Sequence, residues 1–519
     1  MTTRACCGNF KLRFEYWPVV WLWPISLMLM QATLLEIGDF SVTVAVIACH
    51  LLQLHLVMFY WLNRPPHWQI TIALVILAFG LAAGTFARDL PEFLRSFAHV
   101  TNSVLMVLIC LNVRIGRGDE VGRSFTLFCL LASAVALMIA VQAISFNLFR
   151  DFRLAGLLGV FAPLGPGGEI YAPSPYAALP RANGPYSEPS VAGWFMTFAA
   201  ALALAARRFR PALGTLTAAT CSLGAMATLS LTGILGPTLV WAGYLLLVRD
   251  GRRFKAISGL AAGSAIGAAL HQAHEFGILS RFAHLNTPGT SIYFRLSAPY
   301  RLIGESLERY PLGYPLGQTD FIASRHYYIN WDQGSQTNLD NTLLMIVFYF
   351  GLLGILCNAA YLLKAAQFLV LKRHAVGLIM LSLLIAASTT GAGWAHHFML
   401  MIGYAIVVGR WLYERRPLGP SRPPLGLASA AHSAALSRAP GARSAASSSL
   451  CRAFAEVTLL DVAETADLLR KAGEFDRNMV IGGGELLQHL IDDGLVLGDQ
   501  PALQPALGAV AERVERRAA

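Results

Sequence analysis

The first 416 residues alternate between long apolar stretches and short polar connectors. Each apolar stretch is close to the length that crosses the ~30 Å hydrocarbon core of a bilayer, so the pattern predicts about twelve membrane-spanning helices. The predicted spans are Val19–Leu35, Phe40–Leu62, Ile70–Ala87, Ser96–Val113, Ser124–Leu148, Val191–Ala206, Ala212–Leu231, Gly233–Val248, Ala256–His271, Asn341–Leu363, Ala375–Thr390 and Trp394–Leu412. We therefore expect an all-α, polytopic membrane protein.

The positions of Lys and Arg in the short connectors predict the orientation. The even-numbered connectors carry Arg64; Arg114, Arg117 and Arg123; Arg207, Arg208 and Arg210; Arg249, Arg252, Arg253 and Lys255; and Lys364, Lys372 and Arg373. Three odd-numbered short connectors have no Lys or Arg, and the other balances Arg88 and Arg95 with two acidic residues. Because cytoplasmic connectors hold the positive charge, we expect cytoplasmic termini. The two long loops, 147–189 and 272–338, are expected outside.

Composition agrees with this class and argues against others. The chain is 55% apolar and 13% charged, with a mean hydropathy of +0.53, which is unusual for a soluble domain. The net charge of +10 comes mostly from the cytoplasmic connectors, so we expect no nucleic-acid partner. The cysteines avoid both long loops, which argues against an outer disulfide framework. We find no metal-ligand spacing and no nucleotide-binding motif, and we expect neither metal nor cofactor.

The composition changes after residue 416. Residues 417–450 are rich in Pro, Ala, Ser and Gly, which is typical of a disordered linker. Residues 451–519 contain amphipathic helical spacing but are too few to bury a large core. The sequence thus predicts a membrane domain over 1–416, a linker over 417–450 and a small helical cytoplasmic tail of unassigned role.

The first long loop ends in a segment with candidate chemistry. Arg181 begins a run that passes through Asn-Gly-Pro, a turn signal, and Glu188 to Pro189, which suits the first turn of the next span. Arg181 and Glu188 should lie at the outer membrane surface, near a helix N-terminus that favours anions. A simpler interpretation stays open, in which Arg181 meets lipid headgroups and Glu188 only complements the helix dipole.

The second long loop holds three arginines of different kinds. Arg295 stands among aromatic residues shortly before a proline, where a guanidinium suits bidentate phosphate contact. Arg301, Glu305 and Arg309 follow i, i+4 spacing, and we favour a salt-bridge ladder on one helix for them. The following segment, Pro311–Gly317, reads Pro-Leu-Gly-Tyr-Pro-Leu-Gly and predicts tight turns.

The tenth predicted span opens with Asp340 and Asn341. Both residue types cap helix N-termini well, so capping explains one of them. An ionisable group at the mouth of a span is also a functional candidate. His50 and His55 are five residues apart and do not share a helix face, so we interpret them as hydrogen-bonding groups inside the bundle.

These three elements, in this order on this topology, resemble the bacterial O-antigen polymerase and O-antigen ligase superfamily. The segment 181–189 is similar to the family pattern Arg-x-x-Gly-x-[Phe/Tyr]-x-x-Pro, and Arg295 with Pro311–Gly317 is similar to its second arginine motif. Asp340-Asn341, with Gly351 in register, stands where the ligases carry His-Asn. The resemblance covers residues 17–416, and the Asp favours a Wzy-type polymerase over a ligase.

The resemblance implies a GT-C-like membrane glycosyltransferase of the bacterial inner membrane. Its substrate would be an undecaprenyl-diphosphate-linked glycan, joined at the periplasmic face without a metal. Arg181 and Arg295 would bind the diphosphate, and Asp340 or Glu188 would accept the proton, with Asn341, Arg301 and Arg309 as secondary candidates. A flippase and a chain-length regulator would be partners in the pathway.

Two other functions are compatible with parts of the sequence. A ligase would use the same chemistry to move the glycan to another acceptor. A transporter or flippase for the lipid-linked unit would be expected to carry charges inside many spans and to have two similar halves. This chain instead concentrates its outer arginines in the two long loops and has no evident halves.

The predicted topology is testable by cysteine labelling. With the native cysteines removed and outer-membrane permeability controlled, Ser174→Cys and Thr287→Cys should react with an impermeant thiol reagent in intact cells, and Ser258→Cys should not. Labelling of Ser258→Cys alone would reverse the orientation.

Overall fold

The computed structural model describes residues 18–37, 40–59, 65–113, 120–149, 181–186, 188–248, 293–318, 341–389 and 395–414, with six isolated positions between 255 and 287. The chain divides into two compact units, Met1–Pro417 and Leu418–Ala519. The described residues all belong to the first unit. The predicted linker, the tail and nearly all of the ninth predicted span, 256–271, lie outside them and stay predictions.

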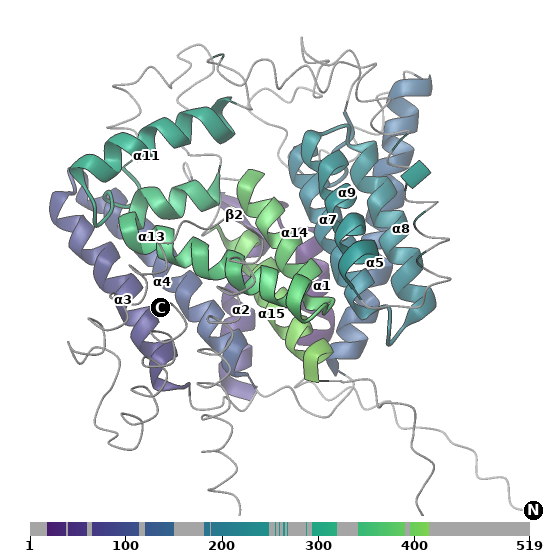
Figure 1. The fold of residues 1–519 in the computed structure, drawn as a ribbon, viewed down its shortest axis with the longest axis horizontal. Helices are drawn as coiled ribbons and strands as arrows, with labels where there is room; N and C mark the ends of the chain where they lie inside the picture. The colour runs from purple at the N-terminus through teal and green to yellow at the C-terminus, as the bar shows by residue number, and fades with distance from the viewer. Residues whose placement is uncertain are drawn as a thin grey trace, which may run out of the picture. The chain divides into compact units, whose positions relative to one another are not determined.

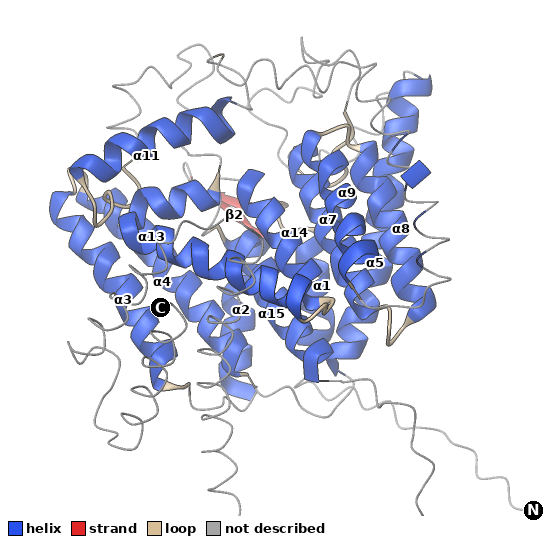
Figure 2. Ribbon diagram, in the orientation of Figure 1, coloured by secondary structure: helices blue, strands red, loops and turns tan. Residues whose placement is uncertain are grey.

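The described part of the first unit is built almost entirely from helices (Figure 1 and Figure 2). The α-helices are α1 Trp23–Met28, α2 Val44–Phe59, α3 His67–Ala83, α4 Leu90–Asn112, α5 Glu120–Ile144, α7 Pro189–Ala206, α8 Pro211–Ala227, α9 Leu231–Leu247, α11 Ala298–Arg309, α13 Thr342–Ala366, α14 Val376–Thr389 and α15 His396–Glu414. Short 3₁₀ or π segments extend or precede several of them: η2 Pro18–Leu22, η3 Gly84–Phe86, η4 Ser145–Phe149, η6 Tyr293–Ser297 and η9 Gln367–Leu371.

Five helical stretches in the described residues are long and apolar enough to cross a membrane: His67–Phe86, Leu90–Asn112, Glu120–Phe149, Pro189–Ala206 and Thr342–Leu371. All of them except Pro189–Ala206 carry large exposed apolar side chains, such as Leu74 and Leu137. Apolar surface of this extent is not left in water by soluble proteins. The helical membrane class is therefore supported, whereas the count of twelve spans stays a prediction.

The first two predicted spans are separated by an unexpected hairpin. The first helix ends at Met28, and strands β1 (Thr33–Ile37) and β2 (Phe40–Thr43) pair antiparallel before α2 begins. The predictions that one span ends at Leu35 and the next begins at Phe40 were therefore wrong. Hydropathy alone cannot separate short apolar strands from helix ends, and the Gly-Asp pair between the strands is the local signal for the hairpin.

Helix α7 is the centre of the larger of two hydrophobic cores. In its 18-residue apolar window 94% of the residues are buried, and it packs against α8, α9 and α14. Helices α7 and α9 can pack this closely only with small residues between them, since a Cβ on Gly193 would lie 2.8 Å from the Gly233 amide nitrogen. Close packing of small residues is the usual way in which helices associate without a hydrophobic driving force.

A second core joins α3, α4, α11 and α13. Phe93, Leu302, Tyr314 and Phe348 are among its buried members. Helix α11 lies over α13 (Figure 1) and turns Leu302 and Ile303 inward, as its amphipathic spacing predicts. The middle of the second long loop is therefore packed against the helices of the membrane unit.

Helix α13 is sharply folded at Gly351. The backbone there has φ 53° and ψ −130°, which strongly favours glycine. The two halves lie side by side, because Asn358 Nδ2 donates to the Leu343 carbonyl oxygen at 2.7 Å. Fifteen residues of straight helix would separate these positions by about 22 Å.

The predicted tenth span is therefore displaced. The segment Thr342–Phe350 is only about 14 Å long, too short to cross a bilayer. The segment Leu352–Leu371 has about 30 Å of helical length and is long enough to cross alone. Asn341 thus opens a short helix folded against the span, which corrects the prediction that it opens the span itself.

The break in α13 is occupied by the backbone of the Pro311–Gly317 turn. The Leu352 N–H donates to the Pro311 carbonyl oxygen at 3.1 Å, and the Tyr314 N–H donates to the Phe348 carbonyl oxygen at 3.0 Å. A Cβ on Gly313, where φ is 115°, would lie 2.2 Å from the Tyr349 carbonyl oxygen. The predicted turn Pro311–Gly317 and the break at Gly351 thus form one joint.

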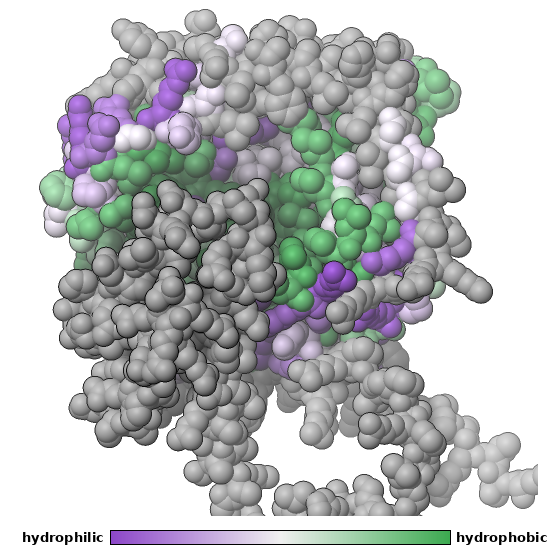
Figure 3. Space-filling model, viewed as in Figure 1, coloured by the Kyte–Doolittle hydropathy of each residue, from purple (hydrophilic) through white to green (hydrophobic). Residues whose placement is uncertain are grey.

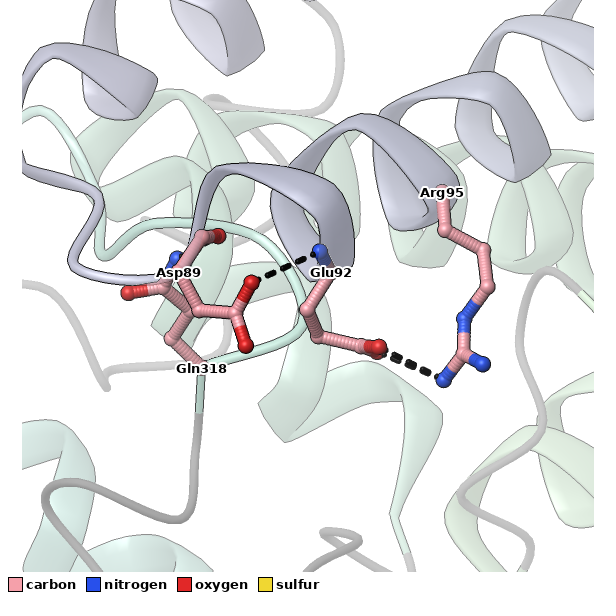
Figure 4. A network of polar contacts seen from close by, with 4 residues as sticks. All are labelled: Asp89, Glu92, Arg95 and Gln318. Atoms are coloured by element: carbon pink, nitrogen blue, oxygen red, sulfur yellow. Dashed lines mark hydrogen bonds and ion pairs between the residues drawn. The ribbon is translucent and has the colours of Figure 1, made fainter.

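A buried glutamine anchors the far end of this turn to α4 (Figure 4). Gln318 is 2% exposed; its Nε2 donates to the Asp89 carbonyl oxygen at 2.7 Å and its Oε1 accepts from the Arg88 N–H at 2.8 Å. Asp89 also caps α4 through the Glu92 N–H, and Arg95 pairs with Glu92 at 2.7 Å. The connector between α3 and α4 is thereby fixed to the second long loop.

We expect Gly351→Ala to destabilise this joint strongly. A Cβ at Gly351 would lie 2.0 Å from the Pro311 carbonyl oxygen, and its positive φ would be strained, for a loss of about 3 kcal/mol or more. The measurement is the melting temperature in detergent, with proteolysis of the outer loop as a second readout.

Gly304→Ala is the matched control. Gly304 is exposed on α11, and a Cβ there meets nothing within 4 Å. This change should stabilise slightly, by about 0.5–1 kcal/mol. Equal melting temperatures of Gly351→Ala and Gly304→Ala would contradict the claim that the joint at Gly351 requires glycine.

Candidate active site

The segment that leads into α7 is held by a tight turn. Gly184 has φ 58°, and a Cβ there would lie 2.7 Å from Ile139 Cγ1 on α5. The buried Gln142 Oε1 accepts from the Asn183 and Gly184 N–H groups, at 3.1 and 2.8 Å. The predicted Asn-Gly-Pro turn is confirmed, and it fixes the start of α7 against α5.

Glu188 occupies the N-cap position of α7, and Pro189 is the first helical residue, as predicted. The Glu188 side chain does not cap the helix; its Oε2 accepts a hydrogen bond from Ser190 Oγ at 2.8 Å. The side chain is 46% exposed. The helix dipole favours a carboxylate at the start of a helix. The Glu188 carboxylate also faces Arg295 of the second long loop.

Arg295 reaches this carboxylate from η6. Its Nη2 donates to Ser190 Oγ at 3.4 Å and lies 3.6 Å from Glu188 Oε2. The Nε–H is buried and has no hydrogen-bond partner in the described part of the chain. A guanidinium has five N–H donors in a planar fork, so these two long contacts leave it with capacity for an anion.

Asn341 fixes the backbone of the same arginine. The amide is 3% exposed, and its Oδ1 caps α13 by accepting from the Leu344 N–H at 3.1 Å. Its Nδ2 donates to the Arg295 carbonyl oxygen at 3.1 Å. The structure thus brings together the end of the first long loop, the middle of the second and the start of α13, with Glu188, Ser190, Arg295 and Asn341 in contact.

The other predicted site residues have separate positions. Arg181 is half-buried at the start of the turn before α7, and Asp340 lies outside the described residues. Arg301 is exposed on α11. The predicted ladder is confirmed between Arg309 and Glu305, whose Nη2 and Oε1 atoms are 3.8 Å apart. Arg309 is therefore placed as a surface ion pair, which contributes little to stability.

The histidines meet in a way that spacing could not predict. His50 and His55 face different neighbours, as expected: the His50 ring lies 5.2 Å from that of His396, and the His55 ring lies 4.8 Å from that of Phe59. The His396 ring is also 5.2 Å from that of His99. Among the described side chains, no group of three or more His, Cys, Asp or Glu is arranged to hold a metal ion.

Most of the chain matches a known family. Residues 18–411 match the family described as WcaD colanic acid polymerase. The chain belongs to this polymerase family. No curated protein matches it. Together with the apolar helices, the family places the protein among membrane-bound polysaccharide polymerases of the glycosyltransferase type.

Ser190 is the site residue that sequence reasoning missed in this polymerase. It bridges Glu188 and Arg295, yet in the sequence it is one small polar residue after a helix-starting proline. Its position two residues after a candidate carboxylate was the available signal. Serine is common at helix starts for structural reasons, so this signal does not by itself indicate a site.

Asn341→Ser tests whether the contact to the Arg295 backbone matters. Serine keeps a cap of similar strength but is too short to donate to the Arg295 carbonyl oxygen. We expect the melting temperature to change little and the polymerisation rate to fall several-fold, because Arg295 loses a positioning contact. Asn341→Ala should lose the cap as well and cost about 1 kcal/mol of stability. Full activity in a stable Asn341→Ser protein would show that this contact is dispensable.

Proposed function

We propose that the polymerase joins polyprenyl-diphosphate-linked oligosaccharide repeat units at the periplasmic face of the bacterial inner membrane. The observation that carries this proposal is the Arg295 guanidinium, held at the junction of both long loops with unused N–H donors. In the proposed topology both termini are cytoplasmic. Polyprenyl tails would lie against the apolar outer faces of the helices, and a flippase and a chain-length regulator would act in the same pathway.

The reaction follows from the groups present. The oxygen of an acceptor sugar hydroxyl attacks the anomeric carbon of the donor, and the bond from that carbon to the diphosphate breaks. The bonding electrons leave on the diphosphate oxygen, where negative charge accumulates. Fixed N–H donors of Arg295, with Arg181 as a second candidate, stabilise this charge in the transition state. This assignment needs no metal.

A carboxylate must accept the proton of the acceptor hydroxyl. Glu188 lies beside Arg295 and is half-exposed, and Asp340 is the neighbour in sequence of Asn341, which contacts Arg295. Phosphate oxygens accept two parallel bonds from one guanidinium. Binding of the diphosphate would therefore displace Glu188 from its 3.6 Å contact and leave its carboxylate free to act as base.

The apolar surface near the site suits a lipid-linked substrate. Below the polar outer face of α11, apolar side chains gather in the space-filling view (Figure 3). Leu352 and Leu356, on the long half of α13, are 56% and 66% exposed. The short half of the same helix begins beside Arg295. An extended apolar tail and a diphosphate headgroup would thus find complementary surfaces on one folded helix.

Arg295 variants test the phosphate role. Arg295→Lys keeps the charge but loses the planar fork, so polymer formation should fall at least tenfold, and Arg295→Ala should abolish it. Protein levels should stay near normal, because the Arg295–Glu188 pair is partly exposed. The control is Arg301→Ala on the exposed face of α11. The readout is polymer length on gels from cells lacking the native gene.

Carboxylate variants separate the two candidate bases. Glu188→Gln and Asp340→Asn each keep the shape of the side chain and remove its proton-accepting ability. The base is the residue whose amide variant accumulates single repeat units while still binding the lipid-linked donor.

Long polymer from Arg181→Ala and from Arg295→Ala would overturn the phosphate assignment.

A further inference from the structure

One tryptophan of the central helix has an N–H group that the fold does not use. Trp194 lies on α7 and is 1% exposed, and its Nε1 is buried without a hydrogen-bond partner among the described residues. A buried N–H left unpaired destabilises the fold, because it has given up its hydrogen bond to water. Such groups are rare in folded proteins and need an explanation.

Two other core tryptophans show the usual solution. Trp23 Nε1 donates to the Leu400 carbonyl oxygen at 3.0 Å, and Trp241 Nε1 donates to Ser222 Oγ at 2.9 Å. Both side chains are buried, as Trp194 is. The core of this polymerase is therefore able to pair an indole N–H.

That position is next to the candidate active site. Ser190 and Trp194 are four residues apart on α7 and so share one face of the helix, about 5–6 Å apart. Ser190 Oγ contacts Arg295 Nη2, and the Trp194 ring packs edge-on against Phe398 of α15, with centroids 6.3 Å apart. The Nε–H of Arg295 is itself buried and unpaired. Trp194 thus lies one helical turn along α7 from Ser190, the residue that Arg295 contacts.

We infer that Trp194 Nε1–H is a second donor to the lipid-linked diphosphate, below the Arg295 guanidinium. A diphosphate carries oxygens on two linked phosphorus atoms and can accept from both donors at once. The indole N–H is neutral, donates only and cannot lose its proton, so it stabilises the leaving group without competing as an acid or base. This inference rests on the proposed function.

The test uses a pair of Trp→Phe variants with opposite expectations. Trp194→Phe and Trp241→Phe lose the same ring volume, but Trp194→Phe removes an N–H with no partner among the described residues, so its melting temperature should fall less than that of Trp241→Phe. The Kd for polyprenyl diphosphate, measured on purified protein in nanodiscs, should rise about tenfold, the loss of one hydrogen bond to a charged group. Trp241→Phe removes a paired N–H. It should lower the melting temperature and leave the Kd within twofold.

Further measurements distinguish a failure of the tryptophan inference from a failure of the proposed function. Polyprenyl monophosphate should bind both variants more equally, since one phosphate reaches one donor. If Trp194→Phe binds polyprenyl diphosphate normally while Arg295→Ala does not, the tryptophan inference fails and the proposed function stands. If neither variant weakens binding, the phosphate site itself is wrong. If the melting temperature of Trp194→Phe falls as far as that of Trp241→Phe while the Kd is unchanged, the indole N–H is already paired, which also overturns the inference.

Discussion

The interaction on which the site depends is the pairing of freed backbone groups at the break of α13. An N–H or C=O released from a helix in apolar surroundings costs free energy until it is paired. At Gly351 the chain turns back, and the Pro311–Gly317 backbone supplies an acceptor to Leu352 and a donor to Phe348. The requirement that every buried backbone group be paired thus makes the second long loop an integral part of the membrane unit.

This joint determines how rigidly Arg295 is held. The turn is continuous with α11, which packs on α13, and η6 with Arg295 directly precedes α11. On the other side, Asn341 at the start of α13 donates to the Arg295 backbone. The arginine is therefore supported from both ends of the short half of α13, by Asn341 at its start and by the joint at Gly351. Sites held on packed elements keep their geometry better than sites on free loops. Arg295 belongs to a loop, but the elements beside it pack in the second hydrophobic core.

Sequence could predict the elements but not how they meet. Hydropathy located most of the helices, because an apolar run of about 20 residues has few other uses. It missed the β1–β2 hairpin and the fold in α13, since neither changes the apolar content. The motifs around Arg181, Arg295 and Asn341 were found as separate signals. Their contacts depend on the two long loops returning to one point, which no spacing rule encodes.

The weakness of the Glu188–Arg295 pair is consistent with a site that must exchange partners. The two groups are 3.6 Å apart, and Glu188 is half-exposed, so the pair contributes at most about 1 kcal/mol. A doubly bonded phosphate on the same guanidinium is stronger. The fold therefore holds the Arg295 backbone through Asn341 and leaves the guanidinium weakly held. A tightly paired arginine is well positioned but cannot bind a ligand. In Arg295 the main chain is held in position, while the guanidinium stays available to bind one.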